Sequence, residues 1–159
     1  MLIIIIINYG IWIWLEGLQE QEPDCGRPLG MRFDRYGSNL FVADAYGGLL
    51  EVNPKARTVS TIVPSNPGVN GLPMMLVNDL DIGRDGTIYF TDSSSKWQRR
   101  YNRYSILEGD KTGRLLAYYP RSGEVEVLVD GLQFANGVQL SPEGDFLLVV
   151  ETTASRIMK

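Results

Sequence analysis

The stretch NDLDIGRDGTIYFTD, residues 78–92, decides the fold class of this chain. It opens on two polar residues, alternates polar and apolar side chains, turns at a glycine, and then runs through apolar residues to an acid. Period-two alternation, a glycine turn and a second β-rich run are typical of a β-hairpin. We therefore predict two antiparallel strands here, with Asn78 at the entry and Asp92 at the exit.

The same pattern occurs twice more, as LGMRFDRYGSNLFVAD at 29–44 and NGVQLSPEGDFLLVVE at 136–151. After the first two acids come further β-rich pairs, GLLEVNP with VSTIV and GRLLAYYP with EVEVLV. Four strands per unit at a period of about 50 to 60 residues indicate propeller blades. We predict an all-β fold of about two and a half blades of four antiparallel strands: 29–64, 78–130, and a third unit that ends soon after Arg156, before its outer strands.

The chain divides into an apolar segment, 1–15, a linker, 16–28, and the propeller part, 29–159. The first segment, MLIIIIINYGIWIWL, is shorter than the roughly 20 apolar residues of a membrane-spanning helix. It also has neither the basic start nor the small-residue cleavage site of a secretory signal. Three interpretations stay open: an anchor or signal-like segment, a strand of the fold, or an artefact of the gene model.

Composition excludes several kinds of chemistry. The chain has no histidine, so it holds no Ser-His-Asp triad, no Cys-His dyad and no His-ligated zinc. Its one cysteine, Cys25, cannot form an internal disulfide. A net charge of −4 argues against nucleic acid as a partner, because phosphate binding needs a surplus of basic side chains. The basic cluster of Lys96, Arg99, Arg100 and Arg103 is expected to be a solvated loop.

Asn78 and Asn136 occupy the same place in successive units. The first strand of a propeller blade lines the central channel, so the two side chains should converge near the axis. Amide oxygens are hard, neutral donors that suit Ca²⁺. Asparagine before Asp or Gly is also a common turn former. From the residues alone, both interpretations stay open: two turn residues, or two channel ligands.

The acids Asp44, Asp92 and Glu151 recur at the same strand end in every unit, which favours an architectural role as acceptors of backbone hydrogen bonds. The serines that follow Asp92, Ser93 to Ser95, lack a histidine base and are expected to form a loop, with substrate contact as the alternative. The Arg- and Tyr-rich insertion at 98–107 could roof the channel or meet a partner.

Read in order, CGRPLG, FVADAYGGLLEVNP, LVNDL, IYFTDSSSKWQRR, GRLLAYYP and FANGVQLSPEGDFLLVVETTASRI resemble the strictosidine synthase-like six-bladed β-propellers over residues 25–157. This resemblance implies a partial six-bladed β-propeller. It also implies a hydrolase of calcium-dependent arylesterase or lactonase type, acting on a small-molecule ester or lactone. In the related paraoxonases, the N-D-I and F-A-N-G motifs supply metal-ligand asparagines, which correspond to Asn78 and Asn136 here.

The resemblance also sets limits. The family's other metal carboxylates belong to blades outside 29–159, so the Ca²⁺ ligand set is incomplete, this chain alone is expected to be inactive, and the catalytic residues are unassigned. Membrane-associated members carry a signal anchor, which implies a membrane location, in the endoplasmic reticulum or at the cell surface, with association through residues 1–15. The alternative is a non-catalytic, membrane-tethered propeller that acts as a binding or scaffold module.

Overall fold

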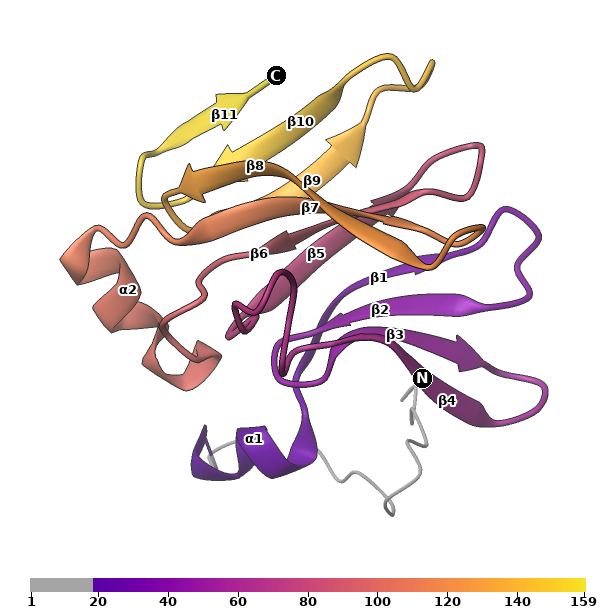
Figure 1. Ribbon diagram of the computed structural model, residues 1–159, viewed down its shortest axis with the longest axis horizontal. Coiled ribbons are helices and arrows are strands. Elements are labelled where there is room, and N and C mark those ends of the chain that lie inside the picture. Colours follow the sequence, from indigo (N-terminus) through magenta and orange to yellow (C-terminus); the bar gives the residue numbers. More distant parts are fainter. Residues whose placement is uncertain (1–18) are drawn as a thin grey trace, which may run out of the picture.

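The computed structural model describes residues 19–159, so the apolar segment 1–15 lies outside the described residues. Within 19–159 the strands form three antiparallel sheets with the orders β1-β2-β3-β4, β5-β6-β7-β8 and β9-β10-β11 (Figure 1). We call them the first, second and third sheets. Their bounds are β1 Pro28–Phe33, β2 Leu40–Asp44, β3 Gly48–Asn53, β4 Thr58–Pro64, β5 Val77–Ile82, β6 Ile88–Asp92, β7 Gly113–Tyr119, β8 Glu124–Leu132, β9 Ala135–Leu140, β10 Leu147–Glu151 and β11 Arg156–Met158. The prediction of an all-β fold is confirmed.

The predicted hairpins form where the glycine turns allow them. Gly86 joins β5 to β6 with φ 91°, and its equivalent Gly144 joins β9 to β10 with φ 80°. A residue with a Cβ atom rarely adopts such angles, so glycine sets the place of each turn. The apolar run after the turn then pairs back on the first strand, with Ile82 opposite Ile88 and Leu140 opposite Leu147.

Several predicted boundaries need correction. The third unit continues one strand further than predicted, because β11 pairs with β10 and gives that sheet three strands within the described residues. The predicted linker holds the 3₁₀ helix η1, Gln19–Gln21, and the short helix α1, Glu22–Cys25, and β1 starts inside it. The insertion is also partly helical, with η2 at Arg99–Tyr101 and α2 at Asn102–Glu108.

The core lies between the sheets. One cluster of buried side chains, which includes Ala43, Leu80 and Leu116, joins the first sheet to the second. A second cluster, which includes Leu115 and Val138, joins the second sheet to the third. Leu115 and Leu116 are neighbours on β7, and successive strand residues point to opposite faces. The second sheet is therefore buried on both faces, and the first strands of the sheets lie side by side, β1 next to β5 and β5 next to β9.

The three strand-end acids are buried and play the predicted architectural role. Each accepts a hydrogen bond from the backbone N–H of a residue one or two positions before the first strand of its own sheet. Leu76 donates to Asp92 Oδ1 over 3.2 Å, and Gln133 donates to Glu151 Oε1 over 2.8 Å. In the first sheet the backbone of Arg27 donates to Asp44. The acid thus ties the end of the second strand to the entry of the first.

Candidate functional site

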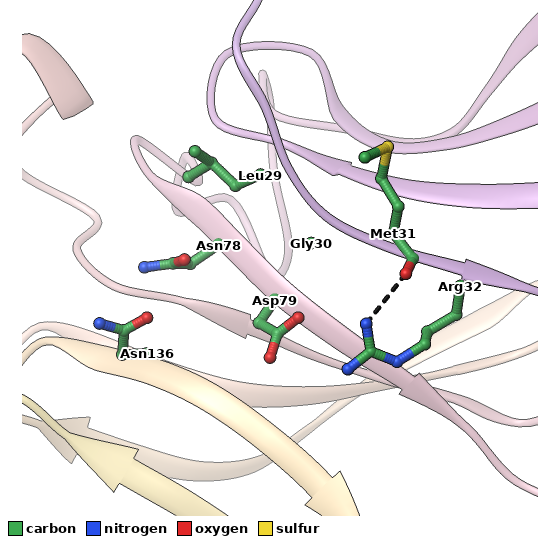
Figure 2. Close-up of a pocket in the computed structure, with 7 residues that line it drawn as sticks. All are labelled: Leu29, Gly30, Met31, Arg32, Asn78, Asp79 and Asn136. Carbon is green, nitrogen blue, oxygen red and sulfur yellow. Dashed lines mark hydrogen bonds between the residues drawn. The ribbon is translucent and has the colours of Figure 1, made fainter. Parts of the chain in front are cut away.

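A pocket of about 470 Å³ lies along the three inner strands β1, β5 and β9 (Figure 2). We call it the inner-strand pocket. Asn78 and Asn136, the two predicted metal ligands, both line it. The full set of lining residues is Leu29, Gly30, Met31 and Arg32 of β1, Asn78 and Asp79 of β5, and Asn136 of β9. The structure thus brings the two asparagines to one pocket, and their assignment as metal ligands stays a prediction.

A bulge explains how neighbouring residues of β5 can both reach this pocket. In a regular strand, Asn78 and Asp79 would point to opposite faces. The pairing of β5 with β6 shifts register between Val77 and Leu80, so both residues lie inside an irregular step of the strand. A bulge re-aims side chains in this way. The register shifts at the same level of the first sheet, between Pro28 and Met31.

The asparagines are held by their amide nitrogens. Asn78 Nδ2 donates to Ser93 Oγ over 2.9 Å, and Asn136 Nδ2 donates to Thr152 Oγ1 over 2.9 Å. Neither Oδ1 atom accepts a hydrogen bond from any residue in 19–159. In Figure 2 the oxygen of each carboxamide lies on the side of Asp79 and the nitrogen on the far side. Both residues sit within strands and have no positive φ, so the interpretation as turn formers is wrong.

Asp79 is a site residue that the sequence reasoning missed. Its Oδ2 accepts from the backbone N–H of Val138 on β9 over 3.2 Å. On the other side, a Cβ atom built on Gly30 would lie 2.4 Å from Asp79 Oδ1, so only a glycine permits this approach. Gly30 and Gly137 occupy the position of Asp79 in the other two units. A carboxylate where the other units have glycine is the sequence signal that could have revealed Asp79 as a site residue.

The side chains of the pocket that could bind a cation are two amide oxygens and one carboxylate. Among its described lining residues Asp79 supplies that carboxylate. No group of three or more Asp, Glu or Cys side chains in residues 19–159 is placed to hold a metal ion. A cation here would therefore rely on Asn78 and Asn136 beside Asp79, a set that suits a hard ion such as Ca²⁺.

Ser93 and Ser94 lie in the predicted loop after β6, but both side chains are fully buried. Ser93 Oγ donates to the carbonyl oxygen of Ala135 over 2.5 Å, and Ser94 Oγ donates to Asp110 Oδ2 over 2.6 Å. Lys96 cannot serve as a base for either serine, because its ammonium group forms an ion pair with Glu108. A role of these two serines in contacting substrate is therefore not supported.

Two arginines of the basic cluster form ion pairs with the chain's own acids. Arg99 Nη1 lies 2.7 Å from Glu22 Oε1, and Arg100 Nη1 lies 3.4 Å from Glu20 Oε2. The Tyr46 hydroxyl donates to Glu22, and burial and this carboxylate raise the pKa of Tyr46 to about 12. The insertion therefore binds the N-terminal helices η1 and α1. No helix in the described part of the chain is long and apolar enough to cross a membrane.

Comparison with known proteins identifies the family. A family model described as strictosidine synthase matches residues 78–159, which is more than half of the chain. The chain belongs to the strictosidine synthase family. The adipocyte plasma membrane-associated protein of Rattus norvegicus is 56% identical over 142 residues, 89% of this chain and 38% of that protein. The protein strictosidine synthase-like 13 of Arabidopsis thaliana is 45% identical over 140 residues, 88% of this chain and 34% of that protein.

The chain thus spans about a third of the length of these relatives of the strictosidine synthase family. A gluconolactonase structure from Xanthomonas campestris matches it with a TM-score of 0.65 at 19% identity, over 82% of this chain and 42% of that chain. Regucalcin from Agrobacterium tumefaciens, described as a calcium-binding protein, matches with a TM-score of 0.56 at 17% identity, over 84% and 38%. At such identities the likeness shows the fold, and the predicted partial propeller is confirmed.

Proposed function

We propose that this chain carries part of the calcium site of a hydrolase that cleaves aryl esters or lactones. One observation carries the proposal: the carboxamides of Asn78 and Asn136 and the carboxylate of Asp79 line the same pocket. Ca²⁺ takes about six to eight oxygen ligands, mainly carboxylates, amide and backbone carbonyls, and water. The three side chains fit the ion in kind, and the remaining ligands would come from water, substrate or other parts of a closed ring.

The residues of the pocket suit such a substrate. When bound, Ca²⁺ acts as a Lewis acid on an ester or lactone carbonyl. Asn78 and Asn136 would hold the ion, and Asp79 would supply negative charge that favours a cation. Leu29 and Met31 of β1 add apolar surface to the same pocket, which suits an aryl or alkyl group of the substrate.

The relatives support the proposal. The solved structures of the same fold include a gluconolactonase and a calcium-binding protein. The name of the rat relative associates it with the plasma membrane, and we extend that location to this chain: a membrane of the endoplasmic reticulum or the cell surface.

Calcium binding is tested on the purified chain by isothermal titration calorimetry. Asn78→Ala and Asn136→Ala should each weaken Ca²⁺ binding about tenfold or more, because each removes one ligand oxygen. Asn102→Ala on α2 is the matched control, since Asn102 lies outside the pocket, and it should bind as the wild type does. A wild-type chain that takes up no Ca²⁺ at millimolar concentrations would refute the metal assignment.

Hydrolysis is tested with phenyl acetate and a γ-lactone, on the 159-residue chain and on a six-bladed ring that contains it. We expect the chain alone to be inactive, and the ring to be active, inhibited by a calcium chelator and restored by added Ca²⁺. Hydrolysis that continues at the same rate in the presence of the chelator would contradict the proposal. Calcium binding without any hydrolysis by the ring would instead favour the non-catalytic binding module.

A further inference from the structure

Each asparagine of the inner-strand pocket is paired with a hydroxyl residue that directly follows a strand-end acid. Asn78 Nδ2 donates to Ser93, the residue after Asp92. Asn136 Nδ2 donates to Thr152, the residue after Glu151. We propose that Ser93 and Thr152 are positioning residues that turn the two carboxamides with their oxygen atoms toward the cation. This inference rests on the proposed calcium site.

Orientation matters because a carboxamide has two ends of nearly equal size and opposite character. The oxygen accepts hydrogen bonds and attracts a cation, whereas the NH₂ group donates hydrogen bonds and repels it. A half turn of the Asn78 carboxamide would therefore replace a ligand oxygen with an NH₂ group that repels the cation. A neighbouring hydroxyl prevents this turn only if it can accept a hydrogen bond and cannot donate one.

Ser93 meets this condition. Its hydroxyl proton is already committed, because Oγ donates to the carbonyl oxygen of Ala135 over 2.5 Å. Ser93 is also fully buried, so water does not compete for its lone pairs. Ser93 Oγ can then only accept from Asn78, which selects Nδ2 as the bonded end and leaves Oδ1 to the pocket.

Thr152 fixes the orientation of the Asn136 carboxamide less firmly than Ser93 fixes that of Asn78. It is exposed, and its hydroxyl donates to no residue of the described chain, so its proton stays free to rotate toward Asn136 Oδ1. The backbone of Asn136 is held from the second sheet instead, since Thr91 Oγ1 donates to the Asn136 carbonyl oxygen over 2.7 Å. We therefore expect Ser93 to matter more than Thr152.

The first sheet provides an internal comparison. The register of each inner strand with its neighbour makes Leu29 equivalent to Asn78 and Asn136. The residue after its strand-end acid is Ala45, the equivalent of Ser93. Asparagine and hydroxyl are thus absent together in this sheet and present together in the other two. A hydroxyl that served only the packing of the strand ends would not need to occur in the same sheets as the asparagine.

The test is Ca²⁺ affinity, measured by titration calorimetry, in Ser93→Ala and Thr152→Ala. Loss of a partner that orients a metal ligand weakens metal binding about 10- to 100-fold. We expect Ser93→Ala to fall in that range and Thr152→Ala to lose less. Thr152→Ser, which keeps the hydroxyl, should bind as the wild type does. Ser95→Ala is the matched control, because the Ser95 side chain makes no hydrogen bond within residues 19–159.

A double variant separates orientation from structural damage. In Asn78→Asp both ends of the side chain are oxygen atoms, so its orientation no longer matters. Adding Ser93→Ala to Asn78→Asp should then not weaken Ca²⁺ binding, although Ser93→Ala alone weakens it. If Ser93 only maintained the shape of the pocket, its removal would weaken binding in both backgrounds, and that result would overturn the inference.

The outcomes distinguish this inference from the proposed function. A wild-type chain that binds no Ca²⁺ overturns both. A wild type that binds Ca²⁺, with Ser93→Ala and Thr152→Ala equal to it, overturns the positioning role and leaves the calcium site standing. Should Ser93→Ala fail to fold, as judged by circular dichroism, the exposed Thr152 carries the test: equal affinity in Thr152→Ala and the wild type then overturns the inference.

Discussion

In the second and third sheets, an arginine faces the strand-end acid from the neighbouring strand. Arg114 lies opposite Asp92, with Nη2 2.6 Å from Oδ2, and Arg156 lies opposite Glu151. Burial raises the pKa of Asp92 to about 7, although the hydrogen bonds from Arg114 favour the ionised form. At Glu151, burial is outweighed by the hydrogen bonds from Arg156 and from the backbone of Gln133, and the pKa is lowered.

The first sheet has no such arginine, because Gly48 lies opposite Asp44. A Cβ atom on Gly48 would lie 2.1 Å from the carbonyl oxygen of Val63, so no side chain fits there. Asp44 Oδ1 accepts from the backbone of Tyr46 and Gly47, but the buried Oδ2 has no hydrogen-bond partner in the described chain. Burial therefore raises the pKa of Asp44, and ionising this carboxyl costs stability.

Asp44→Asn should change how stability depends on pH. The folded chain holds the Asp44 proton more tightly than the unfolded chain, because its folded pKa lies above the ordinary value of 3.8. The stability from this proton is present below about pH 3.8 and is lost as the pH rises through the folded pKa. Measured by urea unfolding from pH 4 to pH 8, the variant should gain stability relative to the wild type as the pH rises. The exposed Ser38→Ala should show a constant difference, and an Asp44→Asn variant that loses stability relative to the wild type as the pH rises would contradict this expectation.

At the scale of elements, the inner strands are joined by carboxylates rather than by a backbone ladder. β5 and β9 belong to different sheets, yet Asp79 Oδ2 accepts from Val138 N, and Asp81 Oδ2 accepts from Leu140 N over 2.8 Å. Both acids thus bind the backbone of the next inner strand. On the other side of β5, the close approach of Gly30 leaves no room for a side chain on β1. The spacing of β1, β5 and β9 is therefore set by Asp79 of β5 and by Gly30 of β1.

Gly30→Ala should separate β1 from β5. Its Cβ would lie 2.4 Å from Asp79 Oδ1 and 2.6 Å from Asp79 Cα, and the backbone atom cannot move aside easily. Inserting a methyl group into a packed site costs about 1–3 kcal/mol, and we expect at least this loss by urea unfolding. The matched control is Gly137→Ala at the equivalent place of β9, where the nearest atom would lie at an ordinary 3.7 Å and the cost should stay within about 0.5 kcal/mol. Equal costs at the two glycines would refute this account of the spacing.

At the scale of the whole molecule, the two outer sheets each expose an apolar face. Phe33 of β1 is 56% exposed, but it holds the place of Ile82 in β5, which packs against the first sheet. Leu148 of β10 is 38% exposed and holds the place of Tyr89 in β6, which packs against the third sheet. These side chains occupy positions that a neighbouring blade covers, and closed propellers leave no such faces open.

The 159-residue chain should therefore self-associate as its concentration rises, because two apolar faces remain in water. Phe33→Ser combined with Leu148→Ser should increase the monomer fraction, measured by size-exclusion chromatography with light scattering. Leu107→Ser is the control: Leu107 is 82% exposed but lies on α2, away from both sheet faces, and its loss should change association less. A wild-type chain that stays monomeric at all concentrations would contradict this expectation.

Much of the fold could be predicted from the sequence, because the signals are local. Period-two alternation and glycine turns mark each hairpin, and the repeat of Asp44, Asp92 and Glu151 identified their architectural role. The short helix α2 could not be predicted, because seven residues form a stable helix only with tertiary support. Here the buried Ser105 of α2 bonds Asp110 outside the helix, over 3.4 Å.

The sequence by itself determined the repeating unit and the equivalence of Asn78 and Asn136, since both follow from a pattern along the chain. Only the tertiary structure decided which atoms of these residues face the pocket. For Asn78 that choice depends on Ser93, whose hydroxyl donates its hydrogen bond to Ala135, 42 residues further along the chain. The place of Asp79 against Gly30 of the neighbouring inner strand depends on the tertiary structure in the same way. A hydrogen bond or a close approach between distant residues leaves no periodic signal in the sequence, because it exists only once the sheets have packed together.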